Sequence, residues 1–368
     1  MEQWQGSVEV MVIMNMVDFW KGKRVLVTGH SGFKGSWLSL WLHRMGAEVT
    51  GISLEPNTSP NLFELAGVKS LIQSRFIDIR NYSELLAQVK FAQPELVFHL
   101  AAQPLVRASY VEPLATFATN VMGTANLLEA LRFLDSVKVV VMVTTDKVYK
   151  NNEWIYPYRE GDVLGGHDPY SASKAASEIL IASYRDAFLK EQGVSVASAR
   201  AGNVIGGGDW SEDRLIPDAV RAWESNLNLD IRNPKAIRPW QHVLEPLQGY
   251  LTLAERLWHE PELAGAFNFG PDTNESASVQ EVIELARKAY TNAIVSYGAN
   301  TDSIKEAGWL AIETAKSRFV LDVKPKWNLT ETVNRAMNWY AAQYAGQDAY
   351  KLCLDEIMQY ENWVEGEK

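Results

Sequence analysis

Residues 24–38, RVLVTGHSGFKGSWL, decide the fold of this chain. A short β-branched run ends at a turn that carries Gly29, Gly32 and Gly35, and an apolar helical pattern begins directly after the turn. Glycine permits a tight turn and lets the backbone approach a pyrophosphate, which the donors at a helix N-terminus can hold. The spacing is G-x-x-G-x-x-G, not the G-x-G-x-x-G of the basic dinucleotide fingerprint. We expect a dinucleotide site here, against the alternative of a plain glycine-rich turn.

Apolar strand patterns alternate with helix-length segments from residue 24 to residue 200. After the first strand, further apolar runs are EVTGIS, SRFIDI, ELVFHLAA, KVVVMVTT and VSVASAR. Strands separated by helices imply right-handed crossovers. The sequence therefore predicts an α/β fold of the Rossmann type, a doubly wound parallel sheet, in which ligands bind at the carboxyl ends of the strands.

The composition and the pattern of the sequence change after Gly202, where loops rich in Gly, Pro, Trp and Arg alternate with shorter helical patterns. We expect a dinucleotide-binding domain over residues 17–201 and a smaller, mainly substrate-binding C-terminal lobe over residues 202–368, interleaved with the first domain. The tail from about Asp348 predicts a terminal amphipathic helix.

Composition points to a cytoplasmic protein. The net charge of −10 argues against a general nucleic-acid binder, and no apolar run reaches the roughly 18 residues needed to span a bilayer. Residues 1–16 contain Glu2 and Glu9 and lack a basic start, so we expect an N-terminal extension and not a signal peptide. The single cysteine, Cys353, rules out an internal disulfide framework and is expected to be a buried, inert thiol.

The residues after the second and third strands bear on the choice of dinucleotide. Ser53 ends the second strand, Glu55 follows two residues later, and no arginine stands there for a 2′-phosphate. This favours NAD over NADP. Asp78 follows the third strand, where an acid can accept a hydrogen bond from an adenine amino group; the alternative is a solvated loop aspartate.

The stretch YSASK places Tyr170 and Lys174 one helical turn apart. A free tyrosine titrates near pH 10, so a tyrosine base needs its phenolate stabilised, and a lysine at i+4 on the same helix face supplies positive charge. Such a pair also occurs by chance at the start of an amphipathic helix. The glycine-rich turn upstream favours the catalytic reading.

Several stretches together resemble a known family. TGHSGFKG, HLAAQ (99–103), TTDKVY (144–149) and YSASK occur in the order and spacing of extended short-chain dehydrogenases/reductases that act on nucleotide sugars, from about residue 17 to residue 340. More narrowly, AAQPLVRASY, TTDKVYKN, AGNVIGGGDW and IRPWQHVLEPLQGYL are similar to stretches of CDP-glucose 4,6-dehydratases. The resemblance implies NAD as cofactor and CDP-glucose as substrate.

The implied reaction is a hydro-lyase reaction in three steps. Hydride leaves C4 of the glucose for NAD as the 4-hydroxyl loses a proton, water is then eliminated across C5 and C6, and hydride returns to C6. Tyr170 and Lys174 would serve the first step, with Thr145 bonding the same hydroxyl. Asp146 would protonate the departing 6-hydroxyl if burial raises its pKa. Lys147 would be the base at C5, in its neutral form, or would stabilise the enolate.

The pair Asp146-Lys147 separates the possible reactions. By resemblance, dTDP-glucose dehydratases have glutamate where this chain has Lys147, and 4-epimerases have small neutral or hydroxyl residues at both positions. The alternatives are therefore a 4-epimerase, a dehydratase for another nucleotide sugar, and a non-catalytic NAD-binding scaffold, since fold alone does not fix function.

The nucleotide diphosphate needs cations, which arginines supply through bidentate contacts. The expected substrate contacts are Gln103, Arg107, Thr145, Asn203, Arg214, Arg238 and His242. The expected cofactor contacts are Gly29, Ser31, Gly32, Phe33, Lys34, Gly35, Asp78, Ile79, Leu100, Ala101, Ala102, Asn120, Thr144, Tyr170 and Lys174. Trp240 either stacks on the base or is a buried loop tryptophan, and Arg200 is expected to support the fold.

No metal site is expected. His99 and His242 lie far apart, with no cluster of Cys, His and carboxylates at ligand spacing, so His99 is interpreted as a satisfied strand histidine. The helix that begins at Tyr170 and the NVMGTANLLEAL helix resemble the pair that forms a four-helix dimer interface in the family. The resemblance thus implies a homodimer or a dimer of dimers, and a role in making deoxysugars for bacterial surface polysaccharides such as O-antigen.

Overall fold

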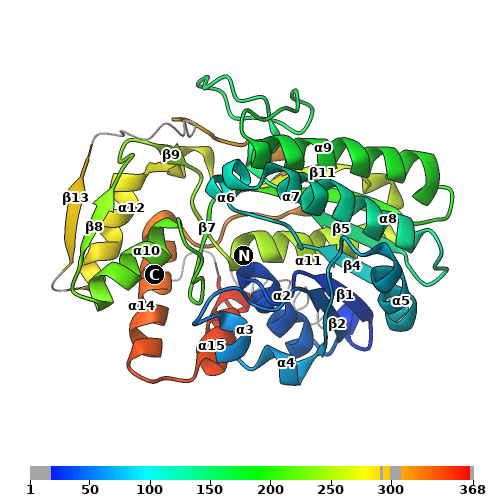
Figure 1. The fold of residues 1–368 in the computed structure, drawn as a ribbon, viewed down its shortest axis with the longest axis horizontal. Helices are drawn as coiled ribbons and strands as arrows, with labels where there is room; N and C mark the ends of the chain where they lie inside the picture. The colour runs from blue at the N-terminus through cyan, green and yellow to red at the C-terminus, as the bar shows by residue number, and fades with distance from the viewer. Residues whose placement is uncertain (1–17, 291–292, 299–307, 365–368) are drawn as a thin grey trace, which may run out of the picture.

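A central sheet of seven parallel strands organises the computed structural model, which describes residues 18–290, 293–298 and 308–364. The predicted extension, 1–16, lies outside the described residues. The strand order is β11-β6-β5-β4-β1-β2-β3 (Figure 1). The strands are β1 (Arg24–Thr28), β2 (Glu48–Ser53), β3 (Gln73–Phe76), β4 (Leu96–His99), β5 (Val139–Val143), β6 (Ser195–Ala201) and β11 (Ala266–Phe269). The doubly wound Rossmann-type sheet is confirmed.

Helices cover both faces of this sheet (Figure 1). Successive strand residues point to opposite faces, so Val25 and Val27 of β1 pack in one core cluster while Leu26 packs in the other. The first cluster includes side chains of α2 (Phe33–Arg44) and α11 (Leu244–His259). The second includes side chains of α5 (Tyr82–Ala92), α8 (Thr124–Leu131) and α9 (Pro169–Tyr184).

The smaller lobe is built from short paired strands and helices beside the sheet (Figure 1). Its strand pairs are β7 (Val204–Ile205) with β10 (Gln241–His242), β9 (Ile237–Arg238) with β12 (Ala277–Ser278), and β8 (Asn228–Ile231) with β13 (Ile294–Tyr297). Its helices are α10 (Leu215–Glu224), α12 (Val279–Ala286) and α14 (Leu329–Tyr344). Between this lobe and the sheet, segments distant in sequence can meet.

The seventh strand and helix α11 come from residues after Gly202. Strand β11 pairs with β6, and α11 contacts β5 and β6, so residues 244–269 complete the first layer although most of the chain after Gly202 forms the second lobe. The sequence pattern indicated interleaving but did not identify AFNF as a sheet strand. The expected terminal helix is present as α15 (Ala349–Glu361), and Cys353 is buried.

Short helices complete the described chain. They are α3 (Leu62–Leu65), α4 (Val68–Leu71), α6 (Val106–Val111), α7 (Pro113–Phe117), α13 (Ala315–Leu321), the π-helical turns η1 (Ala118–Gly123) and η3 (Arg185–Leu189), and the 3₁₀ turns η2 (Asp146–Val148), η4 (Pro261–Leu263), η5 (Thr273–Glu275) and η6 (Arg287–Ala289). Within the described ranges, no helix combines the length and the apolar character that crossing a membrane requires.

Candidate active site

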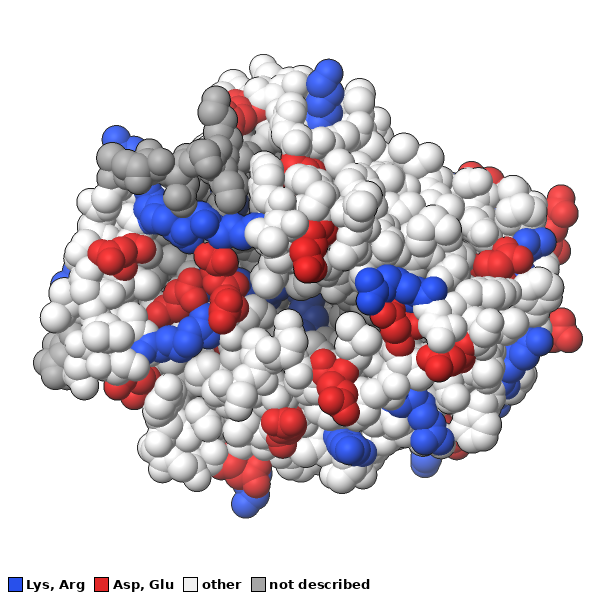
Figure 2. Space-filling model, in the orientation of Figure 1, with Lys and Arg blue, Asp and Glu red and all other residues white. Residues whose placement is uncertain are grey.

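A cavity of about 940 Å³ lies at the carboxyl ends of the strands, between the sheet and the smaller lobe. Figure 2 shows it as a hollow near the middle of this face, with charged side chains gathered around it. The structure brings most of the predicted site residues to this cavity. Those that line it are Gly29, Ser31, Gly32, Phe33, Lys34, Gly35, Asp78, Ile79, Leu100, Ala101, Ala102, Arg107, Thr144, Thr145, Asp146, Lys147, Tyr170, Lys174, Asn203, Arg214 and Arg238.

The glycine-rich turn is too tightly packed for side chains at two of its three glycines. Gly29 has φ +78°, and a Cβ there would lie 2.7 Å from the backbone nitrogen of Ala101. A Cβ on Gly35 would overlap the carbonyl oxygen of Gly29, whereas one on Gly32 would meet nothing nearer than 3.4 Å. The turn therefore brings the open N-terminus of α2 to the cavity, and this arrangement fits the pyrophosphate of a dinucleotide.

The far end of the cavity carries the residues expected near an adenosine. Ser53 donates a hydrogen bond to the hydroxyl of Ser31 at 2.9 Å, and Ser31 donates to the carbonyl oxygen of Leu54 at 2.7 Å. The carboxylate of Asp78 is paired with Arg80 at 2.6 Å, and hydrogen bonds from Arg80 lower the pKa of Asp78. Asp78 is thus an ionised acceptor at the cavity. Its partner Arg80 was not singled out from the sequence.

Helix α9 holds Tyr170 and Lys174 at the end of β5. Asp168 caps the helix by accepting a hydrogen bond from the backbone N–H of Ser171 at 2.8 Å, and Pro169 occupies the first turn. Burial raises the pKa of Tyr170 to about 12, partly offset by a hydrogen bond with Thr145. Burial lowers the pKa of Lys174 to about 8, so its ammonium stays charged at neutral pH. It donates to the carbonyl oxygen of Val143 at 3.3 Å.

Asp146 lies in the 3₁₀ turn directly after Thr145, and its side chain is buried. The hydroxyl of Thr145 donates to Oδ1 of Asp146 at 3.0 Å. Burial raises the pKa of this carboxyl, although the positive charge of Lys147 opposes the shift. The absence of a side chain at Gly202 keeps Oδ2 clear, since a Cβ there would lie 3.2 Å from it. The arrangement suits a carboxylic acid that can release a proton into the cavity.

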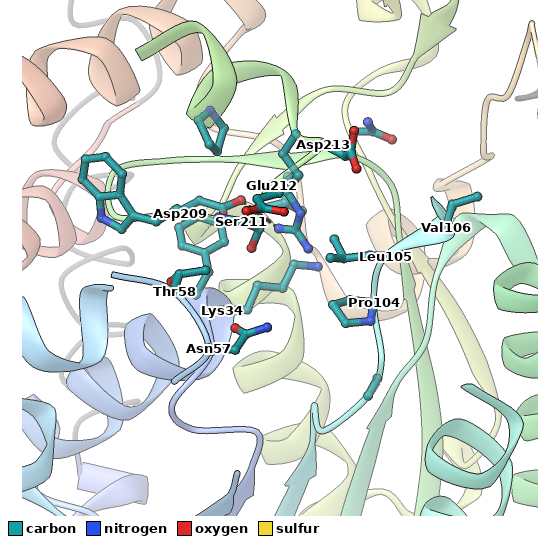
Figure 3. Close-up of a pocket in the computed structure, with 18 of the residues that line it drawn as sticks. Lys34, Asn57, Thr58, Pro104, Leu105, Val106, Asp209, Ser211, Glu212 and Asp213 are labelled. Carbon is teal, nitrogen blue, oxygen red and sulfur yellow. Dashed lines mark hydrogen bonds and ion pairs between the residues drawn. The ribbon is translucent and has the colours of Figure 1, made fainter. Parts of the chain in front are cut away.

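Lys34 extends from the first turn of α2 into the cavity, toward the loop that carries Ser211 and Glu212 (Figure 3). Burial lowers its pKa to about 7, and the positive charge of Arg214 adds to this. The predicted cofactor contact Lys34 is therefore a partly buried amine that interacts with the proposed catalytic residues Asp146 and Lys174, which its place in a glycine-rich turn did not indicate.

The loop after β7 supplies acids that sequence reasoning missed. Asp209 accepts from Nη1 of Arg214 at 2.7 Å, and Asp213 lies 3.5 Å from Nε of Arg107, which comes from α6 on the other lobe. Figure 3 shows Asp209 and Asp213 on this loop, across the cavity from the stretch that contains Leu105. Both acids lie in the stretch GGGDWSED. A run of glycines directly before carboxylates was the feature of the sequence that could have pointed to these residues.

Three predicted contacts do not line the cavity. Gln103 donates to Thr116 at 2.8 Å and Asn120 donates to Ser173 at 2.9 Å, so both side chains brace the neighbouring loop and helix. His242 is fully buried, with its ring 4.8 Å from that of Trp327, and burial lowers its pKa to about 3. The structure does not support His242 as a substrate contact, because packing turns its ring away from the cavity, toward Trp327 and the buried carboxyl of Glu356 at 3.5 Å.

Three further side chains considered in the sequence have hydrogen bonds or ion pairs within the fold. His99 is satisfied by the hydroxyls of Thr28 at 2.7 Å and Thr124 at 3.0 Å, as expected of a strand histidine. Trp240 is buried and donates to the carbonyl oxygen of Ala277 at 3.0 Å, as the buried-loop interpretation expects, but it also lines the cavity, as stacking on a base would require. Arg200 forms a buried ion pair and supports the fold as expected. In the part of the chain that the structure describes, no group of three or more Cys, His and carboxylate side chains could hold a metal ion.

The family model described as GDP-mannose 4,6 dehydratase matches residues 26–346. The chain belongs to this family. It is also 45% identical to a protein from Salmonella typhimurium named CDP-glucose 4,6-dehydratase, over 94% of this chain and 98% of the relative. The predicted resemblance to nucleotide-sugar dehydratases is confirmed.

Two solved structures share the fold. The epimerase Mth375 from Methanothermobacter thermautotrophicus superposes with a TM-score of 0.77 at 23% identity, covering 90% of this chain and 96% of the other. MoeE5, solved in complex with UDP-glucose and NAD, superposes with a TM-score of 0.74 at 24% identity, covering 88% and 100%. At this identity the likeness concerns the fold alone.

Proposed function

We propose that this protein catalyses the NAD-dependent 4,6-dehydration of CDP-D-glucose to CDP-4-keto-6-deoxy-D-glucose and water. The observation that carries the proposal is the place of Asp146: a buried carboxyl with a raised pKa opens on the same cavity as Tyr170 and Lys174. Oxidation alone needs only the tyrosine and the lysine, but water loss needs an acid beside them. The 45% identity to a CDP-glucose 4,6-dehydratase supports the choice of substrate.

In the proposed first step, Tyr170 takes the proton of the 4-hydroxyl and Thr145 orients the same hydroxyl. NAD, when bound, supplies the acceptor and later the donor of the hydride. Burial disfavours the phenolate of Tyr170 in the protein alone. The Lys174 ammonium, one turn further along α9, therefore has to stabilise that phenolate.

Elimination follows at C5 and C6 of the 4-keto sugar. Asp146 donates its proton to the departing 6-hydroxyl through the carboxyl oxygen that faces Gly202. Lys147 lines the same cavity and is the base at C5, or stabilises the enolate by its charge. Asp146 and Lys147 are adjacent residues of one 3₁₀ turn. In the proposed mechanism, the acid and the base would therefore reach the same hexose from different directions.

The remaining lining residues would hold the two ligands. Residues 17–201 mainly hold NAD, through the glycine-rich turn, Asp78 and the stretch 100–102, and residues 202–368 mainly hold the nucleotide sugar. Arg107, Arg214 and Arg238 all line the cavity and would neutralise the diphosphate, together with the amide of Asn203.

Incubation with CDP-glucose and NAD tests the proposal, followed by the absorbance of 4-keto sugars in alkali. Product from CDP-glucose is expected. A signal only with dTDP-, GDP- or UDP-sugars would overturn the substrate, and epimer formed without water loss would identify a 4-epimerase. NAD binding with no turnover of any nucleotide sugar would leave a scaffold.

The proposal includes the oligomeric state, the cellular compartment and the pathway of the enzyme. A homodimer or a dimer of dimers is supported by exposed apolar side chains around α7 to α9, including Leu114, Met122 and Ile179, which are 84%, 56% and 64% exposed. Sedimentation of the purified protein tests this, and a monomer at micromolar concentration would contradict it. The single buried cysteine fits the cytoplasm, and the keto-deoxy product fits deoxysugar and O-antigen biosynthesis.

A further inference from the structure

A buried carboxylate, Glu178, lies one helical turn beyond Lys174 on α9, and the proposed mechanism gives it no task. Its Oε1 accepts from the hydroxyl of Thr144 at 2.5 Å and from Nε of Arg200 at 2.9 Å. Its Oε2 accepts from the hydroxyl of Ser198 at 2.7 Å and from Nη2 of Arg200 at 2.9 Å. Bonds from β6 and from the end of β5 thus fix the position of the carboxylate.

Glu178 interacts directly with Arg200 on β6 and acts on Lys174 on α9. Lys174 also acts on His99 on β4 and on Lys34 on α2, and Arg200 acts on Tyr149, directly after η2, and on Lys316. Burial of Glu178 is outweighed by the hydrogen bonds and charge of Arg200, so its pKa stays low and its carboxylate ionised. This negative charge raises the pKa of Lys174 against the effect of burial.

We propose that Glu178 is a positioning residue for the proposed reaction: its carboxylate keeps the Lys174 ammonium charged beside Tyr170, while Arg200 shares that negative charge. Residues at i and i+4 lie on the same helix face, so the two side chains of α9 are neighbours. An opposite charge at a distance of about 4–6 Å shifts a pKa by about 1–3 units, and a loss of that size would leave Lys174 largely neutral at pH 7. The inference rests on the proposed function.

The relative size of the shift in variants of Glu178 and Arg200 separates this role from a purely structural one. In Glu178→Gln, Lys174 and Arg200 remain buried without the carboxylate, so the alkaline limb of the kcat/KM profile moves to lower pH by about 1–3 units. In Arg200→Gln, Glu178 loses the charge and the hydrogen bonds that keep it ionised against burial, so it takes up a proton, and the limb moves to lower pH by less than in Glu178→Gln because the positive charge of Arg200 is also gone. The double variant removes both charges, so its limb stays nearer to that of the parent protein.

Matched controls separate charge from packing. Ser198→Ala removes one hydrogen bond to Glu178 and no charge, so it lowers stability and leaves the limb in place. Glu178→Asp retains the charge and is expected to keep the limb within a fraction of a unit. If Glu178→Gln does not fold because Arg200 is left buried and unpaired, Arg200→Gln and the double variant still test the inference, since both are expected to move the limb slightly to lower pH and an unchanged limb in both would contradict it.

A direct titration distinguishes failure of this inference from failure of the proposed function. Heteronuclear NMR of labelled lysine, with the Lys174 signal assigned by Lys174→Arg, measures the pKa of Lys174 without substrate. A lower pKa of Lys174 is expected in Glu178→Gln, and a smaller decrease in Arg200→Gln. An unchanged or higher pKa of Lys174 in Glu178→Gln, or a larger decrease in Arg200→Gln than in Glu178→Gln, would overturn the inference, whether or not CDP-glucose is turned over.

Discussion

The hydroxyl of Thr145 donates to Oδ1 of Asp146 at 3.0 Å, and Oδ2 of the same carboxyl has no hydrogen-bond partner among the residues that the structure describes. An unpaired buried polar atom costs free energy, so such atoms in native proteins call for an explanation. Here burial also raises the pKa of the carboxyl. A carboxyl group at the cavity with a raised pKa and a free oxygen is suited to give a proton to a departing hydroxyl.

Replacement Asp146→Asn is expected to lower formation of the 4-keto-6-deoxy product by about 10²–10⁴-fold, because the amide cannot release a proton to the leaving hydroxyl. Oxidation at C4 should persist, visible in a single turnover as the near-ultraviolet absorbance of reduced cofactor. Product formation within a few-fold of the parent protein would show that another group is the acid.

Replacement Tyr170→Phe is expected to abolish turnover, by at least about 10²-fold, while NAD binding is retained. The phenyl ring fills the same buried space and loses only the hydroxyl that takes the 4-hydroxyl proton. Calorimetric titration with NAD and the alkaline product assay measure the two properties separately. Normal turnover would exclude the assigned role of Tyr170.

Two glycines of the first turn should respond differently to alanine. Gly35→Ala places a methyl group against the carbonyl oxygen of Gly29, so we expect a lower melting temperature through a loss of about 1–3 kcal/mol. Gly32 has φ −79°, which alanine adopts freely, and its Cβ would meet only that oxygen at 3.4 Å. Gly32→Ala should therefore keep the melting temperature and weaken NAD binding. Unchanged NAD affinity would argue against a pyrophosphate at this turn.

Replacement Arg214→Gln is expected to raise KM for the nucleotide sugar by about 10–100-fold with a smaller effect on kcat, since hydrogen bonds to charged groups contribute about 1.5–3 kcal/mol. Arg214 already pairs with Asp209 at the cavity, so its guanidinium is oriented before a ligand arrives. Arg256→Gln, which removes a partly exposed ion pair with Glu260 at the end of α11, is the matched control, because Arg256 does not line the cavity. An unchanged KM in Arg214→Gln would remove this arginine from the diphosphate site.

Helix α15 should make stability depend on pH. Burial raises the pKa of Glu356 to about 8, so the folded state binds a proton that the unfolded chain releases near its ordinary pKa of 4.5. The stabilisation is complete below about pH 4.5 and is lost as the pH rises through 8. Glu356→Gln resembles the protonated form at every pH. Its melting temperature should exceed that of the parent protein at about pH 8, and the difference should vanish toward about pH 5.

The exposed neighbour Asp355 provides the control for α15. Asp355→Asn should change the melting temperature little, because this side chain lies on the surface and the substitution removes no buried group. A pH-independent effect of Glu356→Gln would mean that the carboxyl is not protonated in the native protein.

Much of the fold could be predicted because its signals are local. Six strands of the sheet were visible as apolar runs between helical segments, and the terminal helix was visible from its own periodicity. The strand β11 was missed because its four residues carry no signal apart from their pairing with β6. Similarly, Gln103 and His242 have polar side chains in stretches that border the cavity, and only packing decides that one turns to Thr116 and the other to Trp327.

The order of residues along the chain was sufficient to determine the glycine turn and the one-turn separation of Tyr170 from Lys174, because each depends on neighbours within a few positions. It also indicated the parallel sheet, because strand and helix patterns alternate along residues 24–200. Only the tertiary structure decided which charges meet. Lys34, Asp146 and Arg214 come from three distant segments, and their electrostatic coupling exists only where the two lobes close on one cavity. The pKa of Asp146 also depends on the tertiary structure. It is raised by burial, and burial is a property of the assembled fold.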